Sequence, residues 1–431
     1  MTTQNGNYSL EGAEFGVYKE ASFSGSSRVG VLKTDAKGDS NVLSLQVGTY
    51  FVKEIKAPKG YALNPETKTV TISSGRESKV MFEDVPQLCT IEILLRKTDA
   101  DTGENKPQGA ATFRGARFTV KYYDGLWEED TDPEKLGKTA KRTWVFETDE
   151  DGQCSYGKKH LVSGDALYVD LNGRPAVPIG TITIQETKAP EGYLLNPELF
   201  VRQITAKGNT ESVDTYNTLG VPERILKLDL IKRQEGLDVP IPGVKFEHES
   251  PDGKKETIET DQNGELTLKG LQYGTHKIQE ISVMEGYLLN GNVIEFYVAQ
   301  DNQISITSKI DDTLGKAEIQ VTDKGNIIVT MEDPLAPFRL LIHKENQKGK
   351  RLEGAEFTLY AEKTCENVVM RGETGTDGVL ELRNLEVGKR YYMKETKAPE
   401  GYRIPVDLFG NPLVYELWVE SIPAKDTFLF M

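Results

Sequence analysis

One phrase occurs four times along the 431-residue chain, and each copy carries a glutamate at the same place. The copies read VKEIKAPKGYALN, IQETKAPEGYLLN, IQEISVMEGYLLN and MKETKAPEGYRIP, and their glutamates are Glu54, Glu186, Glu280 and Glu395. Carboxyl groups can accept and relay protons, so these four residues are candidates for general acid–base catalysis. Repetition at this scale also indicates an array of similar units.

Each of these glutamates is predicted to lie on the apolar face of a β-strand. Tyr50 and Val52 precede Glu54 with a period of two, and the other three copies have similar spacing. Residues that alternate in this way share one face of a strand. A carboxylate that points towards the core needs a partner or must be neutralised. Four such placements indicate a common role for the glutamate.

A lysine ends an alternating strand in three of the four units. In the third unit, leucines at positions 226, 228 and 230 lead to Lys232, and the equivalent residues of the second and fourth units are Lys97 and Lys344. A single lysine in such a place would be explained as a strand end that reaches water. Three lysines at one repeat position, in units that also bury a glutamate, favour a buried Lys–Glu pair.

The first three units each close with a β-rich stretch that ends in Asn or Asp, and these residues are Asp84, Asn217 and Asp333. Burial disfavours the charged forms of lysine and glutamate, so a proton can pass between them and leave a neutral amine. This amine can attack a side-chain carbonyl held in contact with it, while the glutamate polarises that carbonyl and shuttles protons. The product would be an isopeptide bond, with loss of ammonia from Asn or water from Asp. The alternative is a buried salt bridge with no bond, which is a weak stabiliser.

Two further repeated signals outline the elements that must position these residues. A phrase such as Leu10–Phe15 opens each unit, and a Thr four residues before a Gly, as in Thr34 and Gly38, predicts a hairpin turn midway. Together the signals predict an all-β chain, an array of four Ig-like β-sandwich domains. The expected domains cover residues 1–87, 88–219, 220–335 and 336–431.

The first and last domains are expected to be truncated. Counting back from Gly12 places the lysine of the first unit at Met1 or Thr2, so this domain is expected to lack its first strand. The closing residues 428–431 resemble a strand that has been cut, so the last domain is expected to lack its last strand. We therefore expect the sequence to be a fragment of a longer protein. A missing strand would leave an open β-edge.

The second unit carries insertions, since 34 residues separate Gly152 from Glu186 but only 16 separate Gly264 from Glu280. Insertions on a repeat scaffold are where a binding surface is expected. The candidate ligand-binding residues are aromatic: Trp127, Trp144, Tyr122 and Tyr123. The alternative is that these side chains pack locally over the sandwich.

Composition excludes several other functions. The net charge of -15 argues against nucleic acid as a partner. The three cysteines are far apart and form no CxxC pair, so neither a disulfide framework nor a zinc site is expected. The chain shows no Ser–His or Cys–His pair for a hydrolase, and the TDEDG turn lacks the full ligand series of a calcium loop. We therefore expect no metal, no cofactor and no turnover enzyme. No apolar run is long enough to span a membrane, and no signal peptide opens the chain.

The repeated phrase resembles the E-box of pilins, and the chain resembles tandem Cna B-type domains, also called SpaA-like or prealbumin-like domains, of Gram-positive surface adhesins and pilins. The resemblance covers all four units, although residues 281–284 of the third, Ile-Ser-Val-Met, depart from the usual Thr-Lys-Ala-Pro. It implies a prealbumin-like sandwich in each unit. It also implies a bond from a first-strand lysine to a last-strand Asn or Asp, assisted by the E-box glutamate.

Carried over by position, the resemblance assigns a set of residues to each unit. The second unit would pair Lys97 with Asn217 beside Glu186. The third would pair Lys232 with Asp333 beside Glu280. The fourth offers the donor Lys344 and Glu395 without a visible acceptor, and the first offers Asp84 and Glu54 without a donor.

These features predict a structural stalk or pilin-like segment of a Gram-positive cell-surface adhesin, located on the cell wall. Its neighbours would be other domains of the same full-length surface protein, with no membrane contact in this segment. The competing hypothesis is a ligand-binding adhesin module, in which the insertions of the second domain contact a host extracellular-matrix protein or glycan. A polymerising pilin subunit would need a sortase-reactive lysine motif and an LPxTG-type signal, and neither stands in these residues.

Overall fold

The computed structural model describes residues 7–418 except residues 209, 211, 212 and 215. Strands make up 45% of the chain and helix 1%, which confirms the all-β prediction. The chain divides into two compact units, and each is described by itself. The first comprises residues 1–227, 269–273 and 299–303, and the second comprises residues 228–268, 274–298 and 304–431. None of the helices in the described part of the chain has the length and apolar character needed to cross a bilayer.

The first domain is built on one four-stranded sheet with the order β2-β1-β3-β4. Its strands are β1 (Glu14–Tyr18), β2 (Arg28–Lys33), β3 (Gly48–Lys56) and β4 (Thr67–Ile72). The apolar residues that alternate along β1 and β3, such as Phe15 and Val52, form its core. The predicted donor position at Met1 or Thr2 lies outside the described residues.

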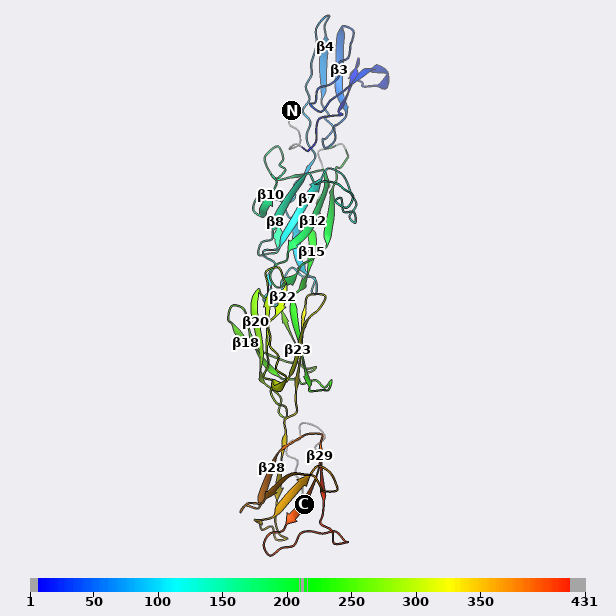
Figure 1. Ribbon diagram of the computed structural model, residues 1–431. Helices are drawn as coiled ribbons and strands as arrows, with labels where there is room; N and C mark the ends of the chain where they lie inside the picture. The colour runs from blue at the N-terminus through cyan, green and yellow to red at the C-terminus, as the bar shows by residue number, and fades with distance from the viewer. Residues whose placement is uncertain (1–6, 209, 211–212, 215, 419–431) are drawn as a thin grey trace. The chain divides into compact units, whose positions relative to one another are not determined.

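The second domain places two larger sheets around one core. One sheet has the order β10-β8-β7-β12-β14, and Figure 1 shows β7, β8 and β12 side by side. These strands are β7 (Arg117–Tyr123), β8 (Arg142–Glu147), β10 (Leu161–Gly164), β12 (Gly180–Lys188) and β14 (Leu199–Ile204). The other sheet has the order β13-β15-β6-β9. Its strands are β6 (Leu95–Asp99), β9 (Gln153–Cys154), β13 (Tyr193–Leu194) and β15 (Leu219–Ile225). A short pair joins β5 (Leu88–Cys89) to β11 (Val177–Pro178).

The closing strand of the second domain lies further along the chain than the sequence indicated. Strand β15 pairs in parallel with β6 as far as Glu223, so it completes the second domain although it starts at the boundary expected at residue 219. Strand β16 of the third domain then begins at Lys227. The structure therefore places the junction near residue 226.

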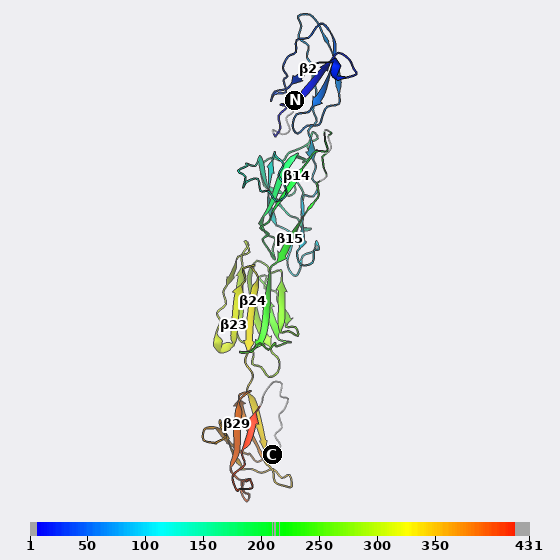
Figure 2. The ribbon, with the colours of Figure 1, turned by 90° about the vertical axis from the view of Figure 1, so that its right-hand side faces the viewer.

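The third domain is a sandwich of a four-stranded and a five-stranded sheet. The first sheet has the order β19-β16-β24-β23, with β24 beside β23 in Figure 2, and the second has the order β18-β17-β20-β21-β22. The first contains β16 (Lys227–Gln234), β19 (Glu265–Lys269), β23 (Lys316–Val321) and β24 (Ile327–Asp333). The second contains β17 (Lys245–Glu249), β18 (Lys255–Glu259), β20 (Gly274–Ser282), β21 (Val293–Val298) and β22 (Ile304–Ile306). Strands β16 and β24, the first and last of this domain, are parallel neighbours.

The fourth domain repeats the arrangement with fewer described strands. A sheet with the order β27-β26-β29-β30 faces the pair β25 and β28 across one core. These strands are β25 (Phe338–His343), β26 (Glu356–Tyr360), β27 (Val368–Glu373), β28 (Val379–Leu385), β29 (Arg390–Lys397) and β30 (Tyr415–Trp418). The closing residues 428–431 lie outside the described residues.

Candidate functional site

The repeated glutamate has the same backbone environment in all four domains. In each domain the glutamate lies opposite a phenylalanine on the neighbouring strand. A β-bulge shifts the strand register next to this pair. The pairs are Glu54 with Phe15, Glu186 with Phe118, Glu280 with Phe246, and Glu395 with Phe357. Bulges re-aim side chains next to functional sites. All four glutamates are buried, as the alternation predicted.

The repeated Thr and Gly hold the lysine strand in place. In the third domain the Thr260 hydroxyl donates to the Ile241 carbonyl and accepts from the Val244 N–H, each at 3.0 Å. The Gly264 carbonyl accepts the backbone N–H of Lys232 at 2.7 Å. Gly264 has a φ of +69°, and a Cβ there would lie 2.6 Å from the Lys232 carbonyl oxygen. Only glycine fits this turn, so the turn fixes where the lysine strand runs.

In the third domain the structure brings the predicted lysine, glutamate and aspartate together. Lys232 Nζ donates to an oxygen of Asp333 and lies 2.7 Å from Glu280 Oε2. All three side chains are inaccessible to solvent or nearly so. Lys232 lies opposite Met331 in the parallel β16–β24 ladder, and Asp333 is two residues further along the same face. The site therefore connects the first strand of the domain to its last.

Burial shifts both carboxyl groups of this site towards their neutral forms. It raises the pKa of Glu280 to about 7, although the charge of Lys232 lowers it. Burial likewise raises the pKa of Asp333 against the effect of Lys232. One Asp333 oxygen, Oδ2, is buried without a hydrogen-bond partner. Near neutral pH the site can thus hold a protonated acid in contact with an amine, which are the reactants of an amide condensation.

The second domain holds a similar cluster with a different third member. Lys97 Nζ donates to both Glu186 and Glu223, and all three side chains are fully buried. Asn217 is exposed and lies ahead of β15, so the structure does not bring the predicted Lys97–Asn217 pair together. The pairing prediction is corrected here: the strand neighbour of Lys97 is Val221, and the inward residue that follows it is Glu223.

The sequence contained a signal for Glu223. In Leu219–Ile225 the buried positions alternate with exposed ones, and Glu223 falls on the buried series with Val221. Burial raises the pKa of Glu223 to about 8 against the effect of Lys97, and the nearby Glu186 raises it further. Burial also raises the pKa of Glu186. A glutamate on the apolar face of a closing strand is the same pattern that identified the other glutamates.

The first and fourth domains hold parts of the same site. Burial raises the pKa of Glu54 to about 7, and the charge of nearby Asp84 raises it further. Glu54 Oε1 and Asp84 Oδ1 are buried without hydrogen-bond partners, and no ion pair to either residue occurs in the described ranges. In the fourth domain, Lys344 Nζ lies 2.7 Å from Glu395 Oε2. The strand that would carry its acceptor is not among the described residues.

A family model for the SpaA prealbumin-like fold domain matches the chain four times, at residues 2–86, 92–219, 227–313 and 338–408. The chain belongs to this family. The four matches confirm the predicted array of prealbumin-like domains, and each one contains one of the repeated glutamates. No curated protein matches the chain.

Several solved structures are similar to this SpaA-family chain. The TIE protein of Bacillus anthracis is 18% identical, with 97% of this chain and 70% of that one covered and a TM-score of 0.34. BcpA, the major pilin subunit of Bacillus cereus, is 16% identical over 75% of this chain and 95% of its own, with a TM-score of 0.31. The major pilin SpaD of Corynebacterium diphtheriae is 16% identical over 77% and 92%, with a TM-score of 0.24. The family match, rather than these distant similarities, establishes the fold.

Three of the four candidate aromatic residues of the second SpaA domain lie in its core. Tyr122, Tyr123 and Trp144 are at most 1% exposed. Trp144 packs edge to face against two tyrosines of the insertion, Tyr156 and Tyr168. Trp127 is half-buried and packs against Tyr123. The insertion thus covers its own sheet, which is the local packing considered as the alternative.

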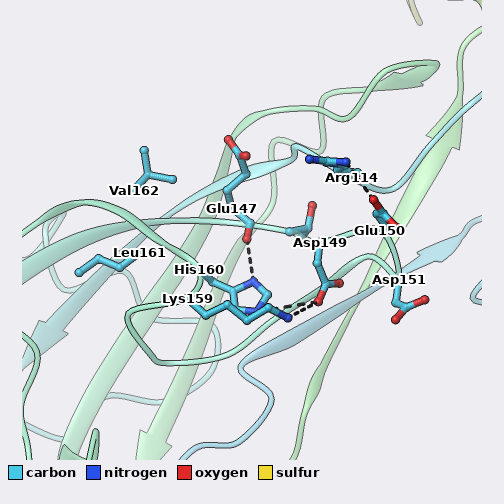
Figure 3. A pocket seen from close by; sticks show the side chains of 10 residues that line it. Arg114, Glu147, Asp149, Glu150, Asp151, Lys159, His160, Leu161 and Val162 are labelled. Atoms are coloured by element: carbon cyan, nitrogen blue, oxygen red, sulfur yellow. Dashed lines mark hydrogen bonds and ion pairs between the residues drawn. The ribbon is translucent and has the colours of Figure 1, made fainter.

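The TDEDG turn of the same domain borders a shallow pocket, shown in Figure 3. There Asp149 accepts a hydrogen bond from Lys159 at 3.2 Å and lies 3.8 Å from His160 Nε2. Its carboxylate also accepts from the Gln153 N–H at 3.1 Å, as expected of a hairpin turn. Within the described ranges, no group of three or more His, Cys, Asp or Glu side chains is placed to hold a metal ion. The acidic turn is therefore explained by its own hydrogen bonds.

Proposed function

We propose that this SpaA-family chain is a structural stalk or pilin-like segment of a Gram-positive cell-surface adhesin, and that its third domain locks itself with an amide bond between Lys232 and Asp333. The observation that carries the proposal is the buried contact of Lys232 with Asp333 and Glu280 between the first and last strands. Extracellular exposure at the cell wall is part of the same proposal.

The proposed bond forms by condensation. Glu280 accepts a proton from Lys232, and the neutral Nζ attacks Cγ of protonated Asp333. The new C–N bond replaces the C–O bond to the acid hydroxyl, and Glu280 passes a proton to the departing oxygen, so that one water leaves. Glu280 then takes the second proton that Nζ loses, which leaves a neutral amide. Holding the reactants in contact gives them a high effective concentration. Because the reaction consumes its own side chains, it happens once per domain and is not turnover catalysis.

Such a bond would suit a chain under tension. Force along the chain enters the third domain near β16 and leaves it near β24, and these strands are adjacent and parallel. A link between Lys232 and Asp333 would carry that force directly, and the intervening chain would bear none. The two residues are 101 positions apart, so nearly the whole domain would be protected from extension.

Pulling single molecules from both ends tests this proposal. The wild-type chain should give no extension event from the segment between Lys232 and Asp333. A Lys232→Arg variant should give one additional event of about 350 Å, the length of the released segment at about 3.5 Å per residue. Lys245→Arg, an exposed lysine of the same domain, is the matched control and should behave as wild type. Full extension of the wild-type third domain would contradict the proposal.

A further inference from the structure

We propose that the second domain closes a covalent bond from Lys97 to Glu223, a glutamate in place of the Asn or Asp expected from the resemblance. This inference rests on the condensation proposed for the third domain. Its own evidence is the geometry around Lys97, which differs from the sequence-based assignment to Asn217.

Strand register assigns Glu223 to the acceptor position. In the third domain Lys232 lies opposite Met331, and the acceptor Asp333 is two residues beyond. In the second domain Lys97 lies opposite Val221, and the residue two beyond is Glu223. Both ladders are parallel, so the two acceptor side chains occupy corresponding places.

Lys97 is confined so that Nζ stays at the Glu223 carboxyl group. Its backbone N–H donates to the Gly152 carbonyl at 2.8 Å, and a Cβ at Gly152 would lie 3.0 Å from Lys97 Cβ. Its Nζ lies 4.5 Å from the centroid of the Phe118 ring, opposite Glu186 in the sheet. From this position Nζ contacts both carboxyl groups.

A plain ion pair would leave this cluster poorly satisfied. One buried ammonium faces two buried carboxyl groups, and Glu223 Oε2 has no hydrogen-bond partner. Buried charge without full compensation is costly, so one carboxyl group is best held protonated. A protonated acid in contact with an amine is the arrangement from which an amide can form, and the condensation removes the amine and the acid together.

The step balances without any added reactant. Glu186 accepts a proton from Lys97, and the neutral Nζ attacks Cδ of protonated Glu223. A C–N bond forms, the C–O bond to the acid hydroxyl breaks, and Glu186 passes a proton to the departing oxygen and then takes the second proton that Nζ loses. One water leaves, and no group is oxidised or reduced. The link would join residues 126 positions apart.

Peptide mapping of the full-length, denatured chain tests the inference. We expect a branched peptide that joins Lys97 to Glu223, with one water missing. In Glu223→Gln the same amide should form with loss of ammonia, so the mature variant and the mature wild type should have identical masses. Glu223→Ala and Glu186→Gln should leave Lys97 in a linear peptide, whereas Asn217→Ala should keep the branched one.

The Lys232–Asp333 peptide serves as an internal control in every digest. If that link is present while Lys97 is linear, or is joined to Asn217 with loss of ammonia, this inference is overturned and the proposed function stands. If both lysines are linear in the wild type, the proposed chemistry itself has failed. Retention of the third-domain link in Glu223→Ala shows that the variant chain still folds there.

Discussion

The third and first domains hold equivalent pairs of carboxyl groups, but they differ in the lysine between them. Glu280 and Asp333 enclose Lys232, whereas Glu54 and Asp84 have no ion-pair partner in the described part of the chain. In both domains burial raises the pKa of the repeated glutamate to about 7. Burial in the sandwich therefore raises the pKa of the repeated glutamate both with and without a lysine beside it. The lysine adds the nucleophile and the link between strands.

The largest effect should come from removing that nucleophile. Lys232→Arg should abolish the link in the third domain and lower its free energy of unfolding by about 5 kcal/mol, because a closed loop of this length restricts the unfolded chain as a disulfide would. Thermal unfolding monitored by calorimetry measures the change.

Two companion variants separate the bond from the charge. Asp333→Asn should still form the amide, with loss of ammonia, and should keep the wild-type melting temperature. Lys245→Arg should have no effect. If the third domain of Lys232→Arg has the same melting temperature as in the wild type, the bond does not stabilise this domain.

A second variant should slow bond formation without removing either reactant. Glu280→Gln should reduce the rate of linking by on the order of a hundredfold or more, since a positioned proton shuttle contributes that much. The mass of freshly made protein, followed over hours after synthesis, reports the linked fraction. Equal rates of linking in the variant and the wild type would show that Glu280 takes no part in bond formation.

The first domain should instead respond to pH. The folded-state pKa of Glu54 lies near 7, above its ordinary value of 4.5, so the folded state binds the proton more tightly. The resulting stability is present below pH 4.5 and is lost as pH rises through about 7. The loss should be on the order of 2 kcal/mol.

Hydrogen exchange of β1 and β3 in the full chain, corrected for the intrinsic effect of pH, measures this loss. Glu54→Gln should flatten the dependence because the amide does not titrate. A wild-type first domain that gains stability between pH 5 and 8 would show the opposite sign and refute the assignment.

A further effect concerns a feature that both domains share. Thr34 in the first domain and Thr260 in the third each hold the opening phrase through a donated and an accepted hydrogen bond. Thr→Val at either position should cost about 1–3 kcal/mol, because buried backbone partners are left unsatisfied. Urea unfolding should give similar losses in the two domains. A loss confined to one would mean that the two turns are not equivalent.

The sequence was sufficient for the parts of the site that repeat. Period-two alternation placed Glu280 and Lys232 on a buried face, and the closing Asp333 stands on the strand predicted to carry it. Asn217 is predicted as the acceptor in the second domain because it ends a β-rich stretch, but the acceptor depends on which residue faces Lys97. That register is set by pairing between distant strands, and a shift of one residue reverses every side chain.

The aromatic residues of the second domain show a second limit. The sequence leaves two places for Trp144, a binding surface or local packing over the sandwich. Its burial depends on Tyr156 and Tyr168, which return over the same sheet. No local pattern specifies that long-range contact.

The intact mass of the purified chain in denaturant tests the central claim most directly. We expect a mass lower than that of the sequence by two waters, one from Lys232 with Asp333 and one from Lys97 with Glu223. The Lys232→Arg variant should have a mass only one water below that of its own sequence. A wild-type mass equal to that of the sequence would contradict the claim that these domains lock themselves covalently.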